Sequence, residues 1–75
     1  MKNVSIASVT SDTTVEAGAK SVTFIFSSDF SGAVAGTDFN GSNDASIDFV
    51  APAGETFGPI DVTVSAGTVR VAVVA

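Results

Sequence analysis

The side chains that could perform chemistry in this sequence are carboxylates, since it contains no histidine and no cysteine. Without those two residue types the usual general bases, the thiolate nucleophile and most transition-metal sites are excluded. The carboxylates in question are Asp38, Asp44, Asp48, Glu55 and Asp61. A pair of them could act as acid and base on a glycosidic bond, but a chain of 75 residues leaves little room for a deep substrate cleft. We therefore expect no enzymatic activity, no catalytic residues and no cofactor.

A glycine-rich segment gathers four residues with side-chain oxygens, and calcium is the metal to consider there. These residues are Asp38, Asn40, Asn43 and Asp44. Calcium prefers hard oxygen ligands on flexible loops, but the spacing matches no EF-hand, and Gly, Asn and Asp are also the ordinary residues of turns. We predict a turn without a metal and keep Asp38 and Asp44 as the calcium candidates. Asp48 and Asp61 are expected on outward faces, as solvated surface.

Size and charge limit the classes of partner. The net charge is −5, and the three basic residues, Lys2, Lys20 and Arg70, are too scattered to bind nucleic acid or an anionic membrane. No stretch approaches the roughly 20 apolar residues of a membrane span, and no signal-peptide core follows Met1. We expect a single β-domain over residues 1–75, in a soluble chain that stays in the cytosol unless it travels inside a larger particle.

The elements that must position these residues are strands, because apolar residues alternate with polar ones and nowhere follow a helical period. The strand-like runs are 3–9, 20–27, 33–35, 44–50, 60–64 and 69–73. Segments 10–18 and 28–43 have turn composition and weak order. The predicted fold is an all-β, small antiparallel β-sandwich or partly closed barrel of about six short strands. Its expected core is Val22, Phe24, Phe26, Ile47, Phe49, Ile60, Val62, Val64, Val69, Val71 and Val73.

The last two runs are interpreted as a β-hairpin. With Ala66 and Gly67 as turn residues, every apolar side chain of 60–64 faces an apolar one of 69–73. Arg70 then lies diagonal to Asp61 on the other face.

Some apolar residues are candidates for a protein interface. Ile25, on the second face of its strand, indicates that this face is covered as well. Near turns, or at the apolar C-terminus, the interface candidates are Phe30, Phe39, Phe57, Val73 and Val74. A small chain with no disulfide buries only about 60% of its unfolded surface, so oligomerisation is the remaining source of stability.

Two long segments resemble a known class of protein. These are SVTSDTTVEAGAKSVTF at 8–24 and IDFVAPAGETFGPIDVTVSAGTVRVAVVA at 47–75. With Ser11 to Thr14 before an aliphatic strand, an Ala53-Gly54 turn and a Pro59-Ile60 entry, the chain resembles small accessory virion proteins of tailed bacteriophages and gene transfer agents, of the head-spike base or capsid decoration type.

This resemblance implies a structural protein of the virion, assembled in the host cytoplasm. It would act without enzymatic activity as a symmetric homo-oligomer, a trimer or pentamer, that decorates or cements the capsid or forms a head-spike or fibre base. The implied partners are other copies of the chain and a major capsid protein or fibre protein, with no nucleic acid, no membrane and no cofactor.

A second resemblance leaves an alternative open. The segments VEAGAKSVTFIF, AGTDF and AGETFGPIDVTV, at 15–26, 35–39 and 53–64, are similar to parts of a Calx-beta type sandwich. Such a module would be calcium-binding or adhesive, and Asp38 and Glu16 would be its first ligands to test. The chain is short for that module.

Overall fold

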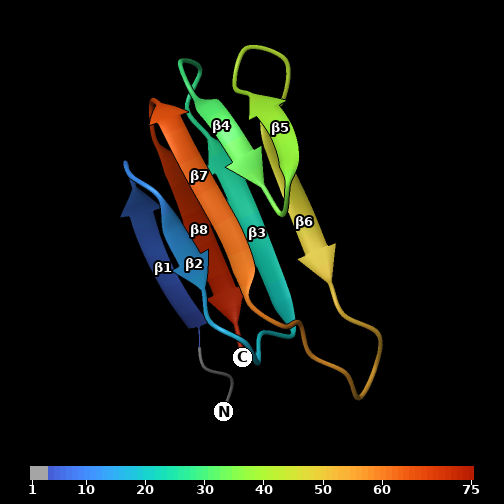
Figure 1. Cartoon of the computed structure of the whole chain (residues 1–75). Coiled ribbons are helices and arrows are strands. Elements are labelled where there is room, and N and C mark those ends of the chain that lie inside the picture. Colours follow the sequence, from blue (N-terminus) through green and yellow to red (C-terminus); the bar gives the residue numbers. More distant parts are fainter. Residues whose placement is uncertain (1–3) are drawn as a thin grey trace.

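Strands make up all the regular secondary structure in the computed structural model, which describes residues 4–75. In chain order they are β1 (Val4–Val9), β2 (Thr13–Val15), β3 (Ser21–Phe26), β4 (Ser31–Val34), β5 (Thr37–Asn40), β6 (Ser46–Val50), β7 (Ile60–Ala66) and β8 (Val69–Val74). Sheet A has the order β1-β8-β3-β6 and sheet B the order β2-β7-β4-β5 (Figure 1). Every pairing is antiparallel. The predicted all-β sandwich is confirmed, with eight strands instead of about six.

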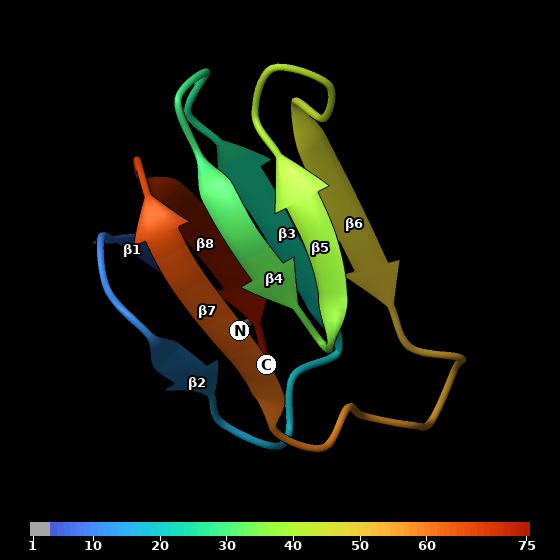
Figure 2. The same cartoon turned by 45° about the horizontal axis from the view of Figure 1, so that its top comes forward.

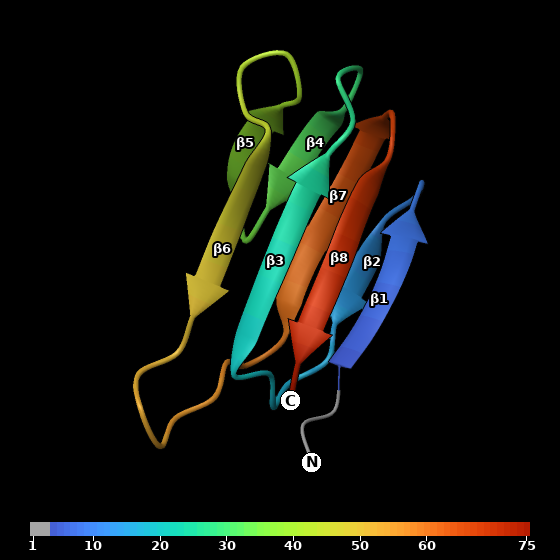
Figure 3. The same cartoon turned by 180° about the vertical axis from the view of Figure 1, so that it is seen from behind.

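The two sheets lie one over the other and enclose the core. Figure 2 shows sheet B in front of sheet A, and Figure 3 shows sheet A from the opposite side. In sheet A, Phe24 of β3 stands opposite Val71 of β8 and Ile47 of β6. From sheet B, Val62 and Val34 face the same interior, where both are almost fully buried. The alternation of apolar and polar residues along the strands therefore gives each sheet one apolar inner face, and the two inner faces pack together as the core.

The hairpin predicted for the last two strands is wrong. β7 pairs with β2 and β4 in sheet B, whereas β8 pairs with β1 and β3 in sheet A. Gly67 and Thr68 carry the chain from one sheet to the other. A period of two identifies the buried face of a strand, but stacked strands bury that face just as hydrogen-bonded neighbours do. As a consequence Asp61 and Arg70 lie on opposite outer surfaces of the sandwich.

Two short elements were not expected from the sequence. Segment 28–43, for which the composition predicts weak order and one short strand at 33–35, forms the hairpin of β4 and β5. Ala35 and Gly36 make its turn, with φ of 53° and 81°. Positive φ at both central residues matches the twist of a two-residue hairpin. β2 lies inside the predicted turn region 10–18 and pairs with β7. The predicted strand 3–9 corresponds to β1, with Asn3 outside the described residues.

The expected core is confirmed and is larger than predicted. Seven of its eleven residues are buried, and the other four, Ile47, Phe49, Val64 and Val73, pack against them partly exposed. The structure adds Val15, Ala19, Phe30 and Val34 to the buried set.

Phe30 is not available to a partner in this structure. Its side chain is 1% exposed, and its ring stacks on Phe26 with the centroids 4.6 Å apart. Phe39 stacks on Phe26 at 5.4 Å, while Phe57 lies 6.1 Å from Phe49. Phe39 and Phe57 both pack against the core and keep only part of their surface exposed. These three phenylalanines, which the sequence places near turns, thus contribute to the core.

Candidate interaction surface

The outer face of sheet A, which we call the apolar face after its three large exposed aliphatic residues, is not covered by any described part of the chain. The side chains of Ile6, Ile25 and Val50 are 66%, 46% and 73% exposed. They come from three different strands, β1, β3 and β6. Ala72 and Val74 of β8 share this face and are partly exposed. Antiparallel sheets that meet water on one side normally carry polar residues there. This face does carry serine, threonine and charged residues, and three large aliphatic residues lie among them.

The register of the strands fixes the layout of this face. One row runs Ser8, Arg70, Ile25, Ser46, and the next runs Ile6, Ala72, Thr23, Asp48. A third row ends the face with Val74, Ser21 and Val50. Among these residues only Arg70 and Asp48 are charged.

Arg70 and Asp48 stand on opposite sides of the central strand β3. Arg70 is next to Ile25, and Asp48 is next to Thr23, so the two charges are two strands and two residues apart. At sheet spacings of about 4.8 Å between strands and about 3.3 Å per residue, their Cα atoms are about 12 Å apart. Both side chains are exposed.

The outer face of sheet B has the opposite character. Its strands present Thr14, Asp61, Thr63, Ala33 and Asp38. The hydroxyl of Thr14 donates to Oδ1 of Asp61 at 3.1 Å, and the N–H of Val64 donates to Oδ1 of Asp12 at 2.9 Å. This face is acidic and hydroxyl-rich, as expected of a surface in water. The outer face of sheet A therefore exposes large aliphatic residues, whereas the outer face of sheet B exposes carboxylates and hydroxyls.

Comparison of the chain with protein-family models, with curated proteins and with solved structures finds no match. In residues 4–75 no helix is long and apolar enough to cross a membrane.

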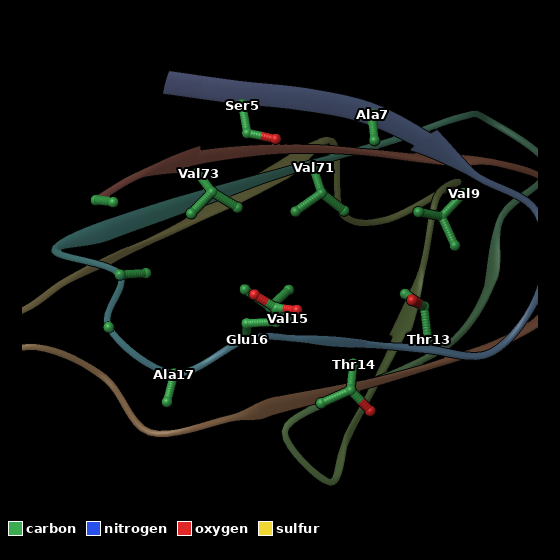
Figure 4. A pocket seen from close by; sticks show the side chains of 13 residues that line it. Ser5, Ala7, Val9, Thr13, Thr14, Val15, Glu16, Ala17, Val71 and Val73 are labelled. Carbon is green, nitrogen blue, oxygen red and sulfur yellow. The ribbon is translucent and has the colours of Figure 1, made fainter. Parts of the chain in front are cut away.

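A cleft opens between the sheets at the edge formed by β1 and β2. Its volume is about 350 Å³, and Figure 4 shows Ser5 and Ala7 of β1 pointing into it toward Val15. Val71 and Val73 form its wall on β8. Because Ser5 and Ala7 are small, the core is incompletely filled here. The cleft suits an aliphatic group, and its described lining contains no set of catalytic side chains.

The calcium candidates share a hollow beside the loop that follows β5. Asp38, Asn40, Asn43 and Asp44 all line it. Two of the side-chain oxygens there are already hydrogen-bonded: Oδ2 of Asp44 accepts the N–H of Asn40 at 3.3 Å, and Oδ1 of Asn40 accepts the N–H and the hydroxyl of Ser42 at 2.9 and 2.6 Å. In the part of the chain that the structure describes, no three acidic side chains converge as metal ligands would. The segment has the hydrogen bonds of a closed turn.

Other predicted pairs of acids are separated. Glu16 lines the cleft beside β2, whereas Asp38 is on β5, so these two residues lie at opposite edges of sheet B. Asp48 and Asp61 lie outward, as expected, but on different faces of the sandwich. Neither pair can act on one ligand or one bond within a single chain.

The apolar face includes only one of the interface candidates that the sequence predicts. Val74 belongs to it, while Val73 points inward and lines the cleft. Ile6, Ile25 and Val50 are its exposed residues, and of these the sequence pattern singles out only Ile25. The signal that reveals the others is an apolar residue on both faces of the same strand, as in the run Ser46 to Val50.

Proposed function

We propose that this chain is a non-enzymatic structural subunit that assembles with copies of itself as an accessory protein of a tailed-phage virion. In that role it would decorate or cement the capsid or form the base of a head spike or fibre. The observation that carries the proposal is the presence of three large, exposed aliphatic residues on the outer face of sheet A. An antiparallel sheet normally presents polar residues to water, so these three favour a protein contact at this face.

Energetics favour assembly through this face. Removing apolar surface from water contributes about 25 cal/mol per Å². Ile6, Ile25 and Val50 keep a large part of their surface in water in the single chain. The chain has no cysteine and therefore no disulfide. A small domain of this kind gains stability when a symmetric contact covers such residues. The acidic outer face of sheet B supports solubility of the assembly.

The phage context is supported by the resemblance of segments 8–24 and 47–75 to accessory virion proteins. A sandwich without a catalytic constellation in its described residues suits a building block of a particle. The proposed further partner is a major capsid protein or a fibre protein.

The native mass of the purified chain tests the proposal. We expect a discrete homo-oligomer by native mass spectrometry and light scattering, with a population that rises between micromolar and millimolar protein. Purified virions from the source of the sequence should also contain the chain. A well-folded monomer at every concentration contradicts self-assembly, and absence from the particles contradicts the virion role.

A calcium-binding or adhesive module is the second candidate. The observation in its favour is the hollow that brings Asp38 and Asp44 together. A calcium titration of the melting temperature distinguishes it from the first.

A further inference from the structure

The outer face of sheet A carries two opposite charges, and any partner that covers the face must compensate both of them. Arg70 and Asp48 are the two charged residues in its rows, and both are exposed in the single chain. Covering the face would remove them from water, which is costly unless each charge meets an opposite one. The occupant must therefore offer an acid opposite Arg70 and a base opposite Asp48, set among apolar groups. A second copy of the same face offers both.

We propose that two copies pack sheet A against sheet A about a two-fold axis that crosses β3 between Thr23 and Ile25. The inference rests on the proposed self-assembly and specifies its contact. Arg70 of each copy then pairs with Asp48 of the other, giving two ion pairs.

The register places the axis. Arg70 is level with Ile25 on one side of β3, and Asp48 is level with Thr23 on the other side. The midpoint between the two charges is therefore on β3, between those two residues. A two-fold axis through this point, lying between the sheets and perpendicular to the line that joins the charges, exchanges Arg70 with Asp48. At regular sheet spacings the strands of the two copies cross at about 70°, closer to orthogonal than to aligned packing.

The same operation also matches the apolar residues, which were not used to place it. The two copies of Ile25 meet beside the axis. Ile6 of each copy falls over Ser21 and next to Val50 of the other copy, and the two copies of Val74 come close together. Ile6 and Val50, which have the largest exposed fractions among the large apolar residues of this face, thus cover each other. An isologous contact requires this self-complementarity.

The expected contact is small. Four strands about 4.8 Å apart and six residues of about 3.3 Å give a face of about 19 by 20 Å. Standard interfaces bury about 800 Å² per partner, and a face of this size is about half of that in projection, so the contact belongs with weak, transient interfaces. We expect a dimer that dissociates on dilution and that depends on its ion pairs for specificity. The two-fold contact also replaces the trimer or pentamer expected from the sequence with an even number of copies.

Charge reversal tests the arrangement. Arg70→Asp and Asp48→Arg each place like charges opposite one another, and each should weaken self-association at least about tenfold. The double variant restores opposite charges and should associate within about threefold of the original chain. An equimolar mixture of the two single variants should form a heterodimer, because both of its pairs are again attractive. Sedimentation equilibrium measures the dissociation constants, and circular dichroism checks that every variant is folded.

Cysteine cross-linking provides a second readout, since the natural chain has no cysteine. Thr23→Cys places a thiol beside the axis. Because stacked sheets lie about 10 Å apart, too far for a disulfide, a short bismaleimide should link the two copies into a covalent dimer. Thr63→Cys, at the centre of the outer face of sheet B, is the matched control and should remain largely uncross-linked.

The outcomes separate this inference from the proposed function. An oligomer that is indifferent to charge reversal, with no preferential cross-link in the Thr23→Cys variant, overturns the face-to-face contact and leaves self-assembly standing. A monomer at all concentrations, without a cross-link in that variant, overturns both. Rescue by the double charge-reversal variant supports both.

Discussion

The backbone of Gly67 lies against the backbone of Phe30: a Cβ atom on residue 67 would stand 2.6 Å from Cα of Phe30. Gly67 has φ of 76°, in the left-handed region. It follows β7 and begins the crossing from sheet B to sheet A, directly over a buried phenylalanine. A Cβ atom on Gly32 would meet the carbonyl oxygen of Thr63, and one on Gly41 would meet that of Ser27, so both of these glycines also allow the main chain to pack closely near Phe30. The crossing point of the sandwich therefore depends on the absence of a side chain.

The first prediction concerns this close approach. Gly67→Ala should cost about 3 kcal/mol or more of unfolding free energy, because strained φ adds to a clash with backbone that cannot move aside. Gly54→Ala is the control, since Gly54 has φ of 82° but open space around its Cβ position. That variant should lose only about 1 kcal/mol. Equal losses in urea unfolding would show that packing against Phe30 is unimportant.

The second prediction concerns the link between Ser27 and Thr68. Oγ of Ser27 accepts the N–H of Thr68 at 2.9 Å and donates to Oδ1 of Asp29 at 2.6 Å. Ser27→Ala leaves a partly buried N–H without this partner, and we expect a loss of about 1 to 2 kcal/mol. Ser28→Ala, at an exposed neighbouring position, should stay within about 0.5 kcal/mol of the original chain. Thermal melts of both variants give the comparison, and a neutral Ser27→Ala would contradict the role of the hydroxyl.

The third prediction fills the cleft at the β1 edge. Ala7 points into that cleft opposite Val71, so Ala7→Val adds apolar volume and β propensity at a site with free space. Stability should rise by about 0.5 to 1 kcal/mol. Ala7→Thr has nearly the same shape but carries a hydroxyl, and it should gain less. A destabilised Ala7→Val variant would mean that the cleft closes in solution.

The fourth prediction concerns the hairpin turn at Ala35 and Gly36. Alanine adopts positive φ reluctantly, whereas asparagine is favoured at this position of a two-residue turn. Ala35→Asn should therefore stabilise the chain by about 0.5 to 1 kcal/mol. Ala35→Val should destabilise it, because a β-branched residue fits that conformation poorly. Opposite signs for the two variants are the expected result of a urea unfolding series, and matching signs would refute it.

The fifth prediction concerns calcium. Because Asp44 and Asn40 already accept hydrogen bonds within the turn, millimolar calcium should leave the melting temperature unchanged. A rise in melting temperature that disappears in Asp38→Asn and Asp44→Asn would favour the calcium-binding alternative instead. Magnesium at the same ionic strength is the control for non-specific screening.

The sequence predicts well which face of each strand is buried, and it predicts poorly which strands are hydrogen-bonded to each other. The alternation in 20–27, 60–64 and 69–73 identifies core residues that the structure buries, since the period of two directly reflects the two sides of a strand. It does not identify the sheet in which a strand lies, and the pattern therefore predicts a hairpin of β7 and β8 that does not form. The division of β7 and β8 between the two sheets depends on the close approach of Gly67 and Phe30, which is a tertiary contact.

The local sequence pattern predicts neither the short strands β2 and β5 nor the outer face of sheet A, for different reasons. β2 has three residues and β5 four, so each owes its strand character to its neighbour. Ile25 alone hinted at a covered second face. Val50 and Ile6 became part of one surface only when the register of four strands placed them together.

The different outsides of the two sheets determine what a dimer would present. If two copies join through sheet A, both acidic faces of sheet B point away from each other, at opposite ends of a four-layered block. Such a block presents the same acidic, hydroxyl-rich surface twice, at two ends that are related by the two-fold axis and held at a fixed spacing.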